Sequence, residues 1–175
     1  MDSRPARSAW RDSRLAAIEQ RLQELGLQLP PPLVVPANVR LPFAFVRVSS
    51  CRAFISGHAP QDPDGHVTRL RGKVGRDLTV EQGYYAARLT GLSILGNLQR
   101  TIGDLDRITA WVRVFGMVNA APGFNQLPSV INGFSDLILE LYGADRGTHA
   151  RSAVGMAELP FDIPVEIEAE VEIAS

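Results

Sequence analysis

The sequence predicts an α+β fold, a single β-sheet with two helices packed on one of its faces. Two amphipathic helical stretches, over residues 79–103 and 129–143, are each flanked by β-rich stretches, and the resulting order is ββ-α-β-α-ββ. The chain has 175 residues, of which 45% are hydrophobic and 21% charged. This size and composition are typical of one soluble domain with a hydrophobic core.

Residues 1–40 are expected to lead into a main domain over residues 41–175. The first twelve residues offer neither an apolar stripe nor a helix cap, and we interpret them as a disordered lead-in. A short helix is expected over residues 13–25, because apolar residues recur there at helical spacing and Gly26 follows. The Pro-rich LPPPLVVP is then a connector, since proline disfavours helices and central strands.

The first half of the main domain predicts two strands and a long helix. FAFVRVSS and CRAFISG are rich in β-formers, with a turn near Ser49 and Ser50, and APQDPDGH is a loop. Thr79 and Gln82 form the Thr-x-x-Gln pattern of a capping box, so a helix begins there. Gly103 follows the last residue of its apolar stripe.

The second half predicts a strand, a helix and two further strands. ITAWVRVFGMV is β-rich, Ser129 is the expected cap of the second helix, and Gly143 is its expected end. RSAVGMAEL predicts another strand. In VEIEAEVEI, apolar residues alternate with glutamates, which predicts a strand with one buried face.

The central strand carries apolar residues on both of its sides. Alternation from Ile108 places aliphatic side chains on one side and Trp111 and Phe115 on the other. Two helices cover only one face of a sheet, so an exposed apolar face would remain, and such patches usually mark interfaces. We therefore expect a closed, symmetric homo-oligomer with Trp111 and Phe115 turned toward its centre.

Composition narrows the classes of function. The formal charge of −1 and the pI of about 6.3 give no sign of a nucleic-acid-binding surface. No apolar run approaches a membrane span, the N-terminus lacks the apolar region of a secretory signal, and the lone Cys51 fits a reducing compartment, so a cytoplasmic location is expected. The three histidines and Cys51 lack metal-ligand spacing, and no metal site is expected.

Arg151 is the residue that stands out chemically. It opens a strand otherwise made of small and apolar residues, where a guanidinium is costly to bury unless it meets an anion. One interpretation is that Arg151 is a surface residue at a strand end. The other is that its guanidinium binds a ligand carboxylate through two parallel hydrogen bonds. The glutamates from Glu166 to Glu172 are most simply a solvated strand face.

Three segments follow one another along the chain: FISGHAPQDPDG, GNLQRTIGDLDRI and ARSAVGMAELPFDIPVEIEAEV. Together, in this order, they resemble the RidA/YjgF family, also labelled endoribonuclease L-PSP. The resemblance covers residues 41–173, and the front helix with GLQLPPP is similar to a longer subgroup of unsettled activity. It implies a chorismate-mutase-like fold and a homotrimer whose sheets close into a barrel, with ligand pockets between subunits. It also implies hydrolysis of reactive enamines and imines to 2-keto acids and ammonia, without a cofactor.

The resemblance also implies roles for individual residues. Arg151 matches the arginine that binds the substrate carboxylate, and Glu166 matches the glutamate that handles the attacking water. Ser56 and Gly57 match the Ser-Gly at the pocket floor. Three neighbouring positions depart from the family pattern and are expected to line the same pocket. They are Phe43 for a tyrosine, His58 for a glutamine and Ala153 for a cysteine.

Three functions therefore remain open. Imine or enamine hydrolysis is the leading hypothesis, and a non-catalytic trimer that binds small carboxylates is the alternative, favoured by Phe43 and Ala153. Ribonuclease activity ranks last, because an acidic chain with a glutamate-rich last strand repels phosphates. His149, two residues before Arg151, is interpreted first as an edge or interface histidine, and second as a group facing the same cleft.

Overall fold

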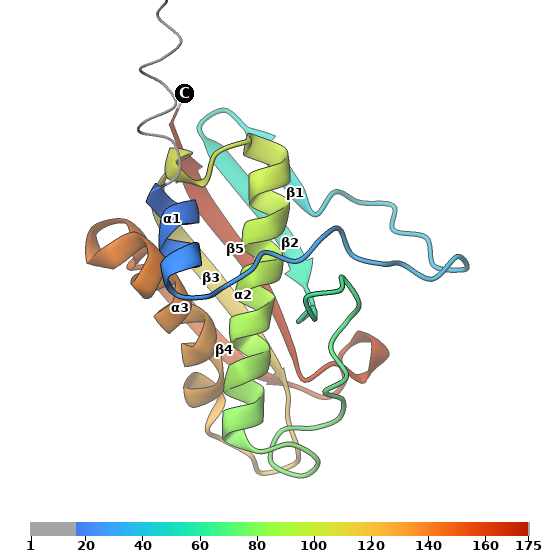
Figure 1. The fold of residues 1–175 in the computed structure, drawn as a ribbon. Coiled ribbons are helices and arrows are strands. Elements are labelled where there is room, and N and C mark those ends of the chain that lie inside the picture. The colour runs from blue at the N-terminus through green and yellow to red at the C-terminus, as the bar shows by residue number, and fades with distance from the viewer. Residues whose placement is uncertain (1–16, 175) are drawn as a thin grey trace, which may run out of the picture.

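The computed structural model describes residues 17–174 and has the predicted α+β architecture (Figure 1). Three helices and two short 3-10 turns accompany a five-stranded sheet within this range. The elements are α1 (Ala17–Glu24), β1 (Val46–Ser49), β2 (Arg52–His58), α2 (Val80–Ile102), η1 (Leu105–Arg107), β3 (Ile108–Asn119), α3 (Leu127–Gly147), β4 (Ala150–Met156), η2 (Pro160–Asp162) and β5 (Val165–Ile173).

The sheet is mixed, with the strand order β1-β2-β5-β3-β4. β3 and β4 run parallel, joined by the crossover helix α3, and the other neighbouring strands are antiparallel. β5 lies in the middle and alternates as predicted. Its valines, isoleucines and alanine are buried, and its glutamates lie on the other face.

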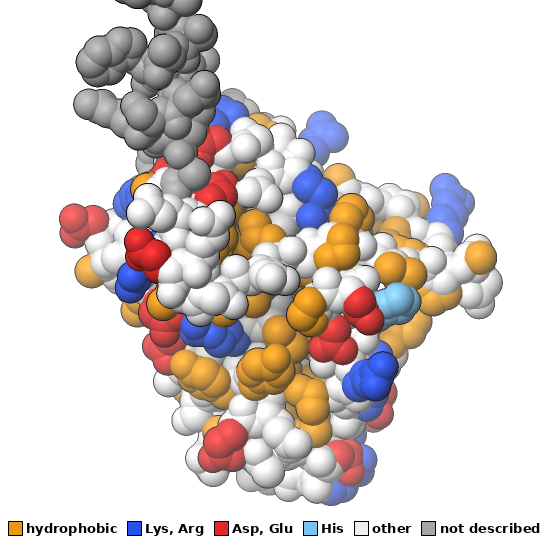
Figure 2. Space-filling view, in the orientation of Figure 1, with side chains coloured by type: hydrophobic (Ala, Val, Ile, Leu, Met, Phe, Trp, Pro, Cys, Tyr) orange, Lys and Arg blue, Asp and Glu red, His pale blue; other side chains and the backbone are white. Residues whose placement is uncertain are grey.

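Helices α2 and α3 cover one face of the sheet, and the core lies between the two layers (Figure 1). The short helix α1 packs beside α3, and its Ile18 and Leu22 belong to the same core. The covered side shows scattered hydrophobic and charged side chains (Figure 2). The face of the sheet opposite α2 and α3 is called the open face below.

The capping box of α2 is confirmed. The hydroxyl of Thr79 accepts from the backbone N–H of Gln82, and the Gln82 side chain accepts from the backbone N–H of Thr79. The expected cap of α3 is wrong, because α3 begins at Leu127 and Ser129 lies within its first turn. Proline in that first turn starts the helix without a side-chain cap, since its fixed φ already suits the position.

The expected direction of Trp111 is also wrong. Its side chain is 1% exposed and makes edge-to-face contacts with Phe134 and Tyr142 of α3, with ring centroids 5.6 and 5.8 Å away. The cause is irregular pairing with β5 at two places, between Ile108 and Ala110 and between Trp111 and Arg113. Each irregularity shifts the alternation of side chains, so a simple count of two fails here. Phe115 does lie on the open face.

Two expectations fall partly or wholly on residues that the structure does not describe. The disordered lead-in over the first twelve residues lies outside the described range, and so does the start of the expected helix over residues 13–25. Within residues 17–174, no helix is both long and apolar enough to cross a membrane.

Candidate functional site

Glu166 lies near the start of β5, opposite Met117 of β3 on the open face. Its carboxylate sits directly against Gly57 of β2, where the Cβ of any larger residue would overlap with Oε1. Burial raises the pKa of Glu166, and the neighbouring charge of Glu168 raises it further. The sheet therefore brings the predicted acid and the predicted Ser-Gly together.

Ser56 and Gly57 occupy an irregularity in the pairing of β2 with β5, between Ile55 and His58. The Ser56 hydroxyl donates to the carbonyl of Ala44 at 2.8 Å, and its backbone N–H donates to the carbonyl of Phe45 at 3.0 Å. Because its proton is used in this way, the Ser56 oxygen is left as an acceptor toward the open face.

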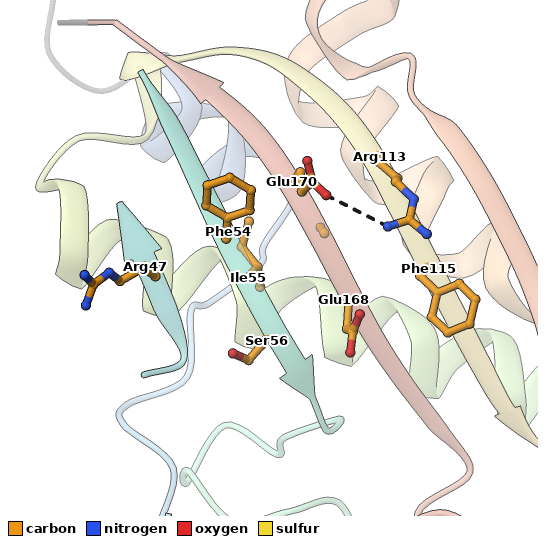
Figure 3. Close-up of a pocket in the computed structure, with 9 residues that line it drawn as sticks. Arg47, Phe54, Ile55, Ser56, Arg113, Phe115, Glu168 and Glu170 are labelled. Atoms are coloured by element: carbon orange, nitrogen blue, oxygen red, sulfur yellow. Dashed lines mark ion pairs between the residues drawn. The ribbon is translucent and has the colours of Figure 1, made fainter. Parts of the chain in front are cut away.

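A cavity of about 290 Å³ lies on the open face beside Ser56 (Figure 3). Oppositely charged side chains line it together with two aromatic rings, and an ion pair of 3.9 Å joins Arg113 to Glu170 across neighbouring strands. The lining residues are Arg47, Phe54, Ile55, Ser56, Arg113, Phe115, Glu168, Ala169 and Glu170. Sequence reasoning did not assign Arg47 and Arg113 to a site, although a charged residue within each β-rich stretch was a usable signal.

His58 does not line this face, which corrects the expectation for it. Its side chain is 1% exposed and points toward α2, where Nε2 lies 2.9 Å from the Asn97 amide. Nδ1 lies 2.6 Å from the carbonyl of Ser56 and must donate to it, since a carbonyl only accepts. Burial lowers the pKa of His58 to about 4, so the ring is neutral at pH 7. Its hydrogen bond to the Ser56 carbonyl supports the backbone there from the side of the sheet that α2 covers.

Arg151 opens the edge strand β4, as the sequence predicts, and reaches across to α3. Its Nη1 donates to Oδ1 of Asn132 and to Oγ of Ser135, both at 2.9 Å. Within residues 17–174, no ion pair to a carboxylate engages this guanidinium. The two partners on α3 were missed, because nothing in the sequence marks which helix faces the start of β4.

His149 lies beside Arg151 on the same edge. Its Nδ1 is 2.7 Å from the carbonyl of Gly147, and its Nε2 is 2.9 Å from Oγ of Ser135. Burial lowers the pKa of His149, and the charge of Arg151 lowers it further. The interpretation of His149 as a group of the Arg151 region is thus the one that the geometry favours.

Within one chain, Arg151 and Glu166 lie on opposite faces of the sheet. Arg151 is paired with Val114, which is buried under the helices, whereas Glu166 is paired with Met117. Paired residues share a face, and positions three apart on a regular strand point to opposite faces. A pocket containing both side chains therefore needs Arg151 from one copy of the chain and Glu166 from another.

Phe43 and Ala153 are also separated by the fold. Phe43 is 51% exposed and packs edge to face on Phe45, with ring centroids 5.5 Å apart. Ala153 is paired with Gly116 of β3 and packs against the core on the Arg151 side. Phe43 thus belongs with the part of the chain leading to Ser56, and Ala153 belongs with Arg151.

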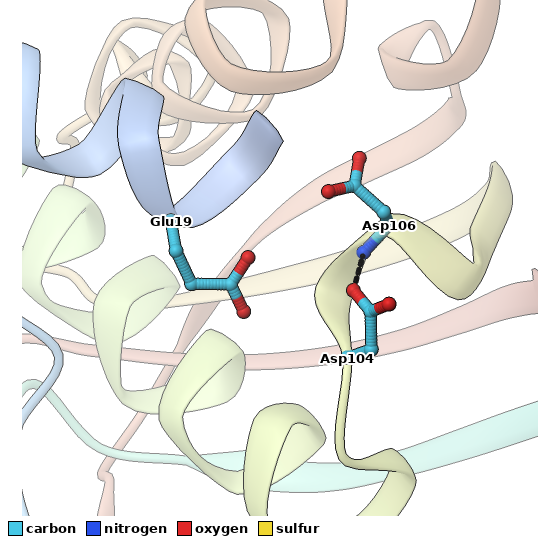
Figure 4. Close-up of side chains that lie close together, drawn as sticks. All are labelled: Glu19, Asp104 and Asp106. Carbon is cyan, nitrogen blue, oxygen red and sulfur yellow. Dashed lines mark hydrogen bonds between the residues drawn. The ribbon is translucent and has the colours of Figure 1, made fainter. Parts of the chain in front are cut away.

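Glu19, Asp104 and Asp106 form an acidic cluster where α1 meets η1 (Figure 4). The two aspartates are already engaged: Asp104 accepts from the backbone N–H of Asp106, and Asp106 accepts from the backbone N–H of Ile18. Arg146 lies 3.6 Å from Asp106. These contacts join α1 to the main core and give the cluster a structural role.

The fold and these residues define a class of small, single-sheet α+β proteins with a guanidinium on an edge strand and a carboxylate on the open face. The sequence profile described as YjgF/chorismate mutase-like, putative endoribonuclease matches residues 19–165. The chain therefore belongs to the YjgF/chorismate mutase-like family, and the resemblance seen in its motifs is confirmed.

Individual relatives agree with this placement over nearly the whole chain. Protein TCP17 of Trypanosoma cruzi is 37% identical over 156 residues, which cover 89% of this chain and 94% of TCP17. The solved structure of Atu1372 from Agrobacterium tumefaciens, a protein of unknown function, is 39% identical with a TM-score of 0.80, covering 90% and 93% of the two chains. A Shewanella oneidensis protein named as a putative endoribonuclease is 28% identical with a TM-score of 0.80, covering 89% and 99%.

Proposed function

We propose that this protein hydrolyses reactive enamines and imines to 2-keto acids and ammonia, as a homotrimer that needs no cofactor. The observation that carries the proposal is the half-buried Glu166 carboxylate packed against Gly57, the residue that follows Ser56. Its raised pKa makes it a stronger base than a solvated glutamate. A carboxylate in this setting is suited to accepting a proton from water.

The reaction follows from the two charged groups. Arg151 binds the substrate carboxylate and fixes the adjacent C=N carbon, and Glu166 takes a proton from a water that attacks this carbon. Glu166 passes this proton to the imine nitrogen, which becomes the amine of a carbinolamine, and the carboxylate is regenerated. The C–N bond then breaks, the hydroxyl proton moves to the departing nitrogen, and the products are ammonia and a 2-keto acid. An enamine enters the same sequence after tautomerising to its imine.

The placement of the two groups on opposite faces supports a site built between copies of the chain. Arg151 lies on the edge strand β4, from which it can reach a neighbouring subunit. The open face carries the cavity beside Ser56, whose aromatic rings and mixed charges suit contact with other copies. In a closed ring, each pocket takes its arginine from one copy and its glutamate from the next.

The direct test is an assay on imines generated in the cuvette. 2-Aminoacrylate formed freshly by a pyridoxal-phosphate enzyme should lose ammonia faster when this protein is added, and 2-keto acid and ammonia should appear in equal amounts. Glu166→Gln is the matched control, because it keeps the size of the side chain and removes the base. A rate equal to the background over a panel of aliphatic and aromatic imines would refute the proposal.

A carboxylate-binding trimer without catalysis is the second candidate function. Phe43 and Ala153 favour it, since neither offers the hydroxyl or thiol that the family pattern has at those positions. In that case, 2-ketobutyrate binds to wild type while every imine is hydrolysed only at its background rate. Restoring the pattern with Phe43→Tyr and Ala153→Cys should then produce activity on 2-aminoacrylate.

A further inference from the structure

The guanidinium of Arg151 is held by one of its nitrogens only. Nη1 carries two hydrogens, and both are used, one by Oδ1 of Asn132 and one by Oγ of Ser135. The guanidinium has five N–H donors in all. The remaining three, one on Nε and two on Nη2, have no hydrogen-bond acceptor among residues 17–174.

The Ser135 hydroxyl is in turn fixed by His149. Nδ1 of His149 faces the carbonyl of Gly147 at 2.7 Å, so Nδ1 carries the hydrogen. In the neutral ring, Nε2 is therefore an acceptor, and the Ser135 hydroxyl donates to it at 2.9 Å. The Ser135 lone pairs are left for Arg151, so His149 Nδ1, the Ser135 hydroxyl and Arg151 Nη1 each donate to an acceptor.

Packing fixes the chain of groups in place. The His149 ring lies edge to face against Phe134, with centroids 6.0 Å apart. An open cavity of about 170 Å³ begins at these groups, lined by Ser135, Leu139, Thr148, His149 and Arg151. A small ligand can therefore approach the guanidinium from outside the core.

We propose that Ser135 and His149 are positioning residues of the anion site. They lock Nη1 of Arg151 onto α3, so that the Nε–Nη2 edge is presented to a ligand carboxylate side-on. The Nε–Nη2 edge carries two parallel N–H bonds, which match the two oxygens of a carboxylate. This inference rests on the proposed role of Arg151 as the carboxylate anchor and adds the groups that orient it.

Ligand binding at Arg151 must then change the pKa of His149. The charged groups acting on this region are Arg151 on β4 and Asp136 on α3, and within residues 17–174 His149 has no carboxylate partner. A carboxylate bound to Arg151 offsets the positive charge beside the ring. A protonated His149 still bonds Ser135, now as the donor, and the second lone pair of Ser135 remains for Arg151. Linkage therefore requires the pKa of His149 to rise when the ligand binds and the ligand to bind more tightly as His149 is protonated.

The test measures 2-ketobutyrate binding to the full-length protein by calorimetry, without reference to turnover. Ser135→Ala removes the acceptor, and we expect affinity to fall about tenfold, the size of one hydrogen bond to a charged group. Ser135→Thr keeps the hydroxyl and should bind like wild type. His149→Phe keeps the ring contact with Phe134 but loses the acceptor, so it should bind like Ser135→Ala.

A histidine titration by NMR needs no variant that could misfold, and the chain has only three histidines to assign. We expect the His149 pKa to rise in saturating 2-ketobutyrate. Wild-type affinity in Ser135→Ala together with an unmoved His149 pKa would overturn the inference, even if Arg151→Ala abolishes binding. Unchanged binding in Arg151→Ala would instead refute the anchor itself, and with it the proposed function.

Discussion

The substitution Gly57→Ala is expected to lower turnover while leaving the free energy of unfolding nearly unchanged. The added Cβ would overlap with Oε1 of Glu166 and come close to two further atoms of the same side chain. The three atoms nearest to this Cβ all belong to the Glu166 side chain, and the φ of Gly57 is not in the left-handed region, so alanine suits the backbone at this position. The carboxylate must therefore move, and little else has to.

The magnitude follows from this displacement. An overlap of this size requires the carboxylate to move by about 1 Å or more, and a misplacement of about 1 Å can lower a rate by roughly 100-fold. Since the Glu166 side chain is flexible at its far end, we expect the free energy of unfolding to change by less than about 1 kcal/mol, below the usual range for overpacked cores. Turnover of 2-aminoacrylate should collapse while the melting temperature stays within a few degrees of wild type.

The assay pairs ammonia release with thermal unfolding, and Gly155→Ala is the matched control. Its Cβ would meet Ala120 at 3.2 Å on the helix side of the sheet, the face opposite to that of Glu166. A double variant, Gly57→Ala with Glu166→Asp, shortens the acid by one methylene and should recover part of the lost rate. Wild-type turnover in Gly57→Ala would show that the position of the Glu166 carboxylate does not matter, and the mechanism would be wrong.

Three further predictions concern the proposed groups and the assembly. Glu166→Gln should still bind 2-ketobutyrate but lose roughly 10²–10⁴-fold in turnover, and in wild type turnover should decline as the pH falls through the raised pKa of Glu166; equal rates in both proteins would exclude this base. Arg151→Ala and Arg151→Lys should both bind the keto acid poorly, because a point charge cannot replace the fork; full affinity in the lysine variant would argue against two-point recognition. Light scattering should give a trimer for wild type, and Phe115→Glu should weaken this trimer, since the new carboxylate faces Glu168 on the paired strand. A wild-type monomer at micromolar concentration would contradict the assembly.

The sequence was most informative where a local signal sufficed. The capping box at Thr79, the alternation of β5 and the order of the elements all follow from spacing within one segment, and the structure confirms them. It failed where pairing between strands decides. Trp111 turns to the helices because the pairing of β3 with β5 shifts on both sides of it, and no residue nearby marks these shifts.

The candidate site shows the same division. Arg151 and Glu166 could be found from their motifs, but the face on which each lies depends on which strands become neighbours. His58 was expected in the pocket because it follows Ser56 and Gly57. The irregular pairing of β2 with β5 instead turns the His58 side chain to the face covered by α2, where it contacts Asn97. Contacts such as these depend on tertiary packing, which spacing along one chain does not report.

The separation of Arg151 from Glu166 leads to a prediction that a site within one chain would not share. Mix two inactive variants, Arg151→Ala and Glu166→Gln, by unfolding and refolding them together. The first retains the glutamate and the second retains the arginine, so a mixed ring contains some pockets with both groups intact. In a ring where each pocket takes one group from each of two neighbours, random mixing restores about a quarter of the pockets.

Ammonia release from the mixture should therefore rise to about a quarter of the wild-type rate, well above that of either variant refolded alone. The double variant, refolded with wild type, is the control for assembly: it lacks both groups, so random mixing again leaves about a quarter of the pockets intact. Recovery in the mixture of single variants requires that the two residues act across a subunit boundary, because no chain in that mixture has both. If the single variants stay inactive together while the control gives about half of the wild-type rate, the two residues must act within one chain, because every wild-type chain then keeps its own pocket. The sheet between them would then have to be bridged in a way that the pairing of β4, β3 and β5 excludes.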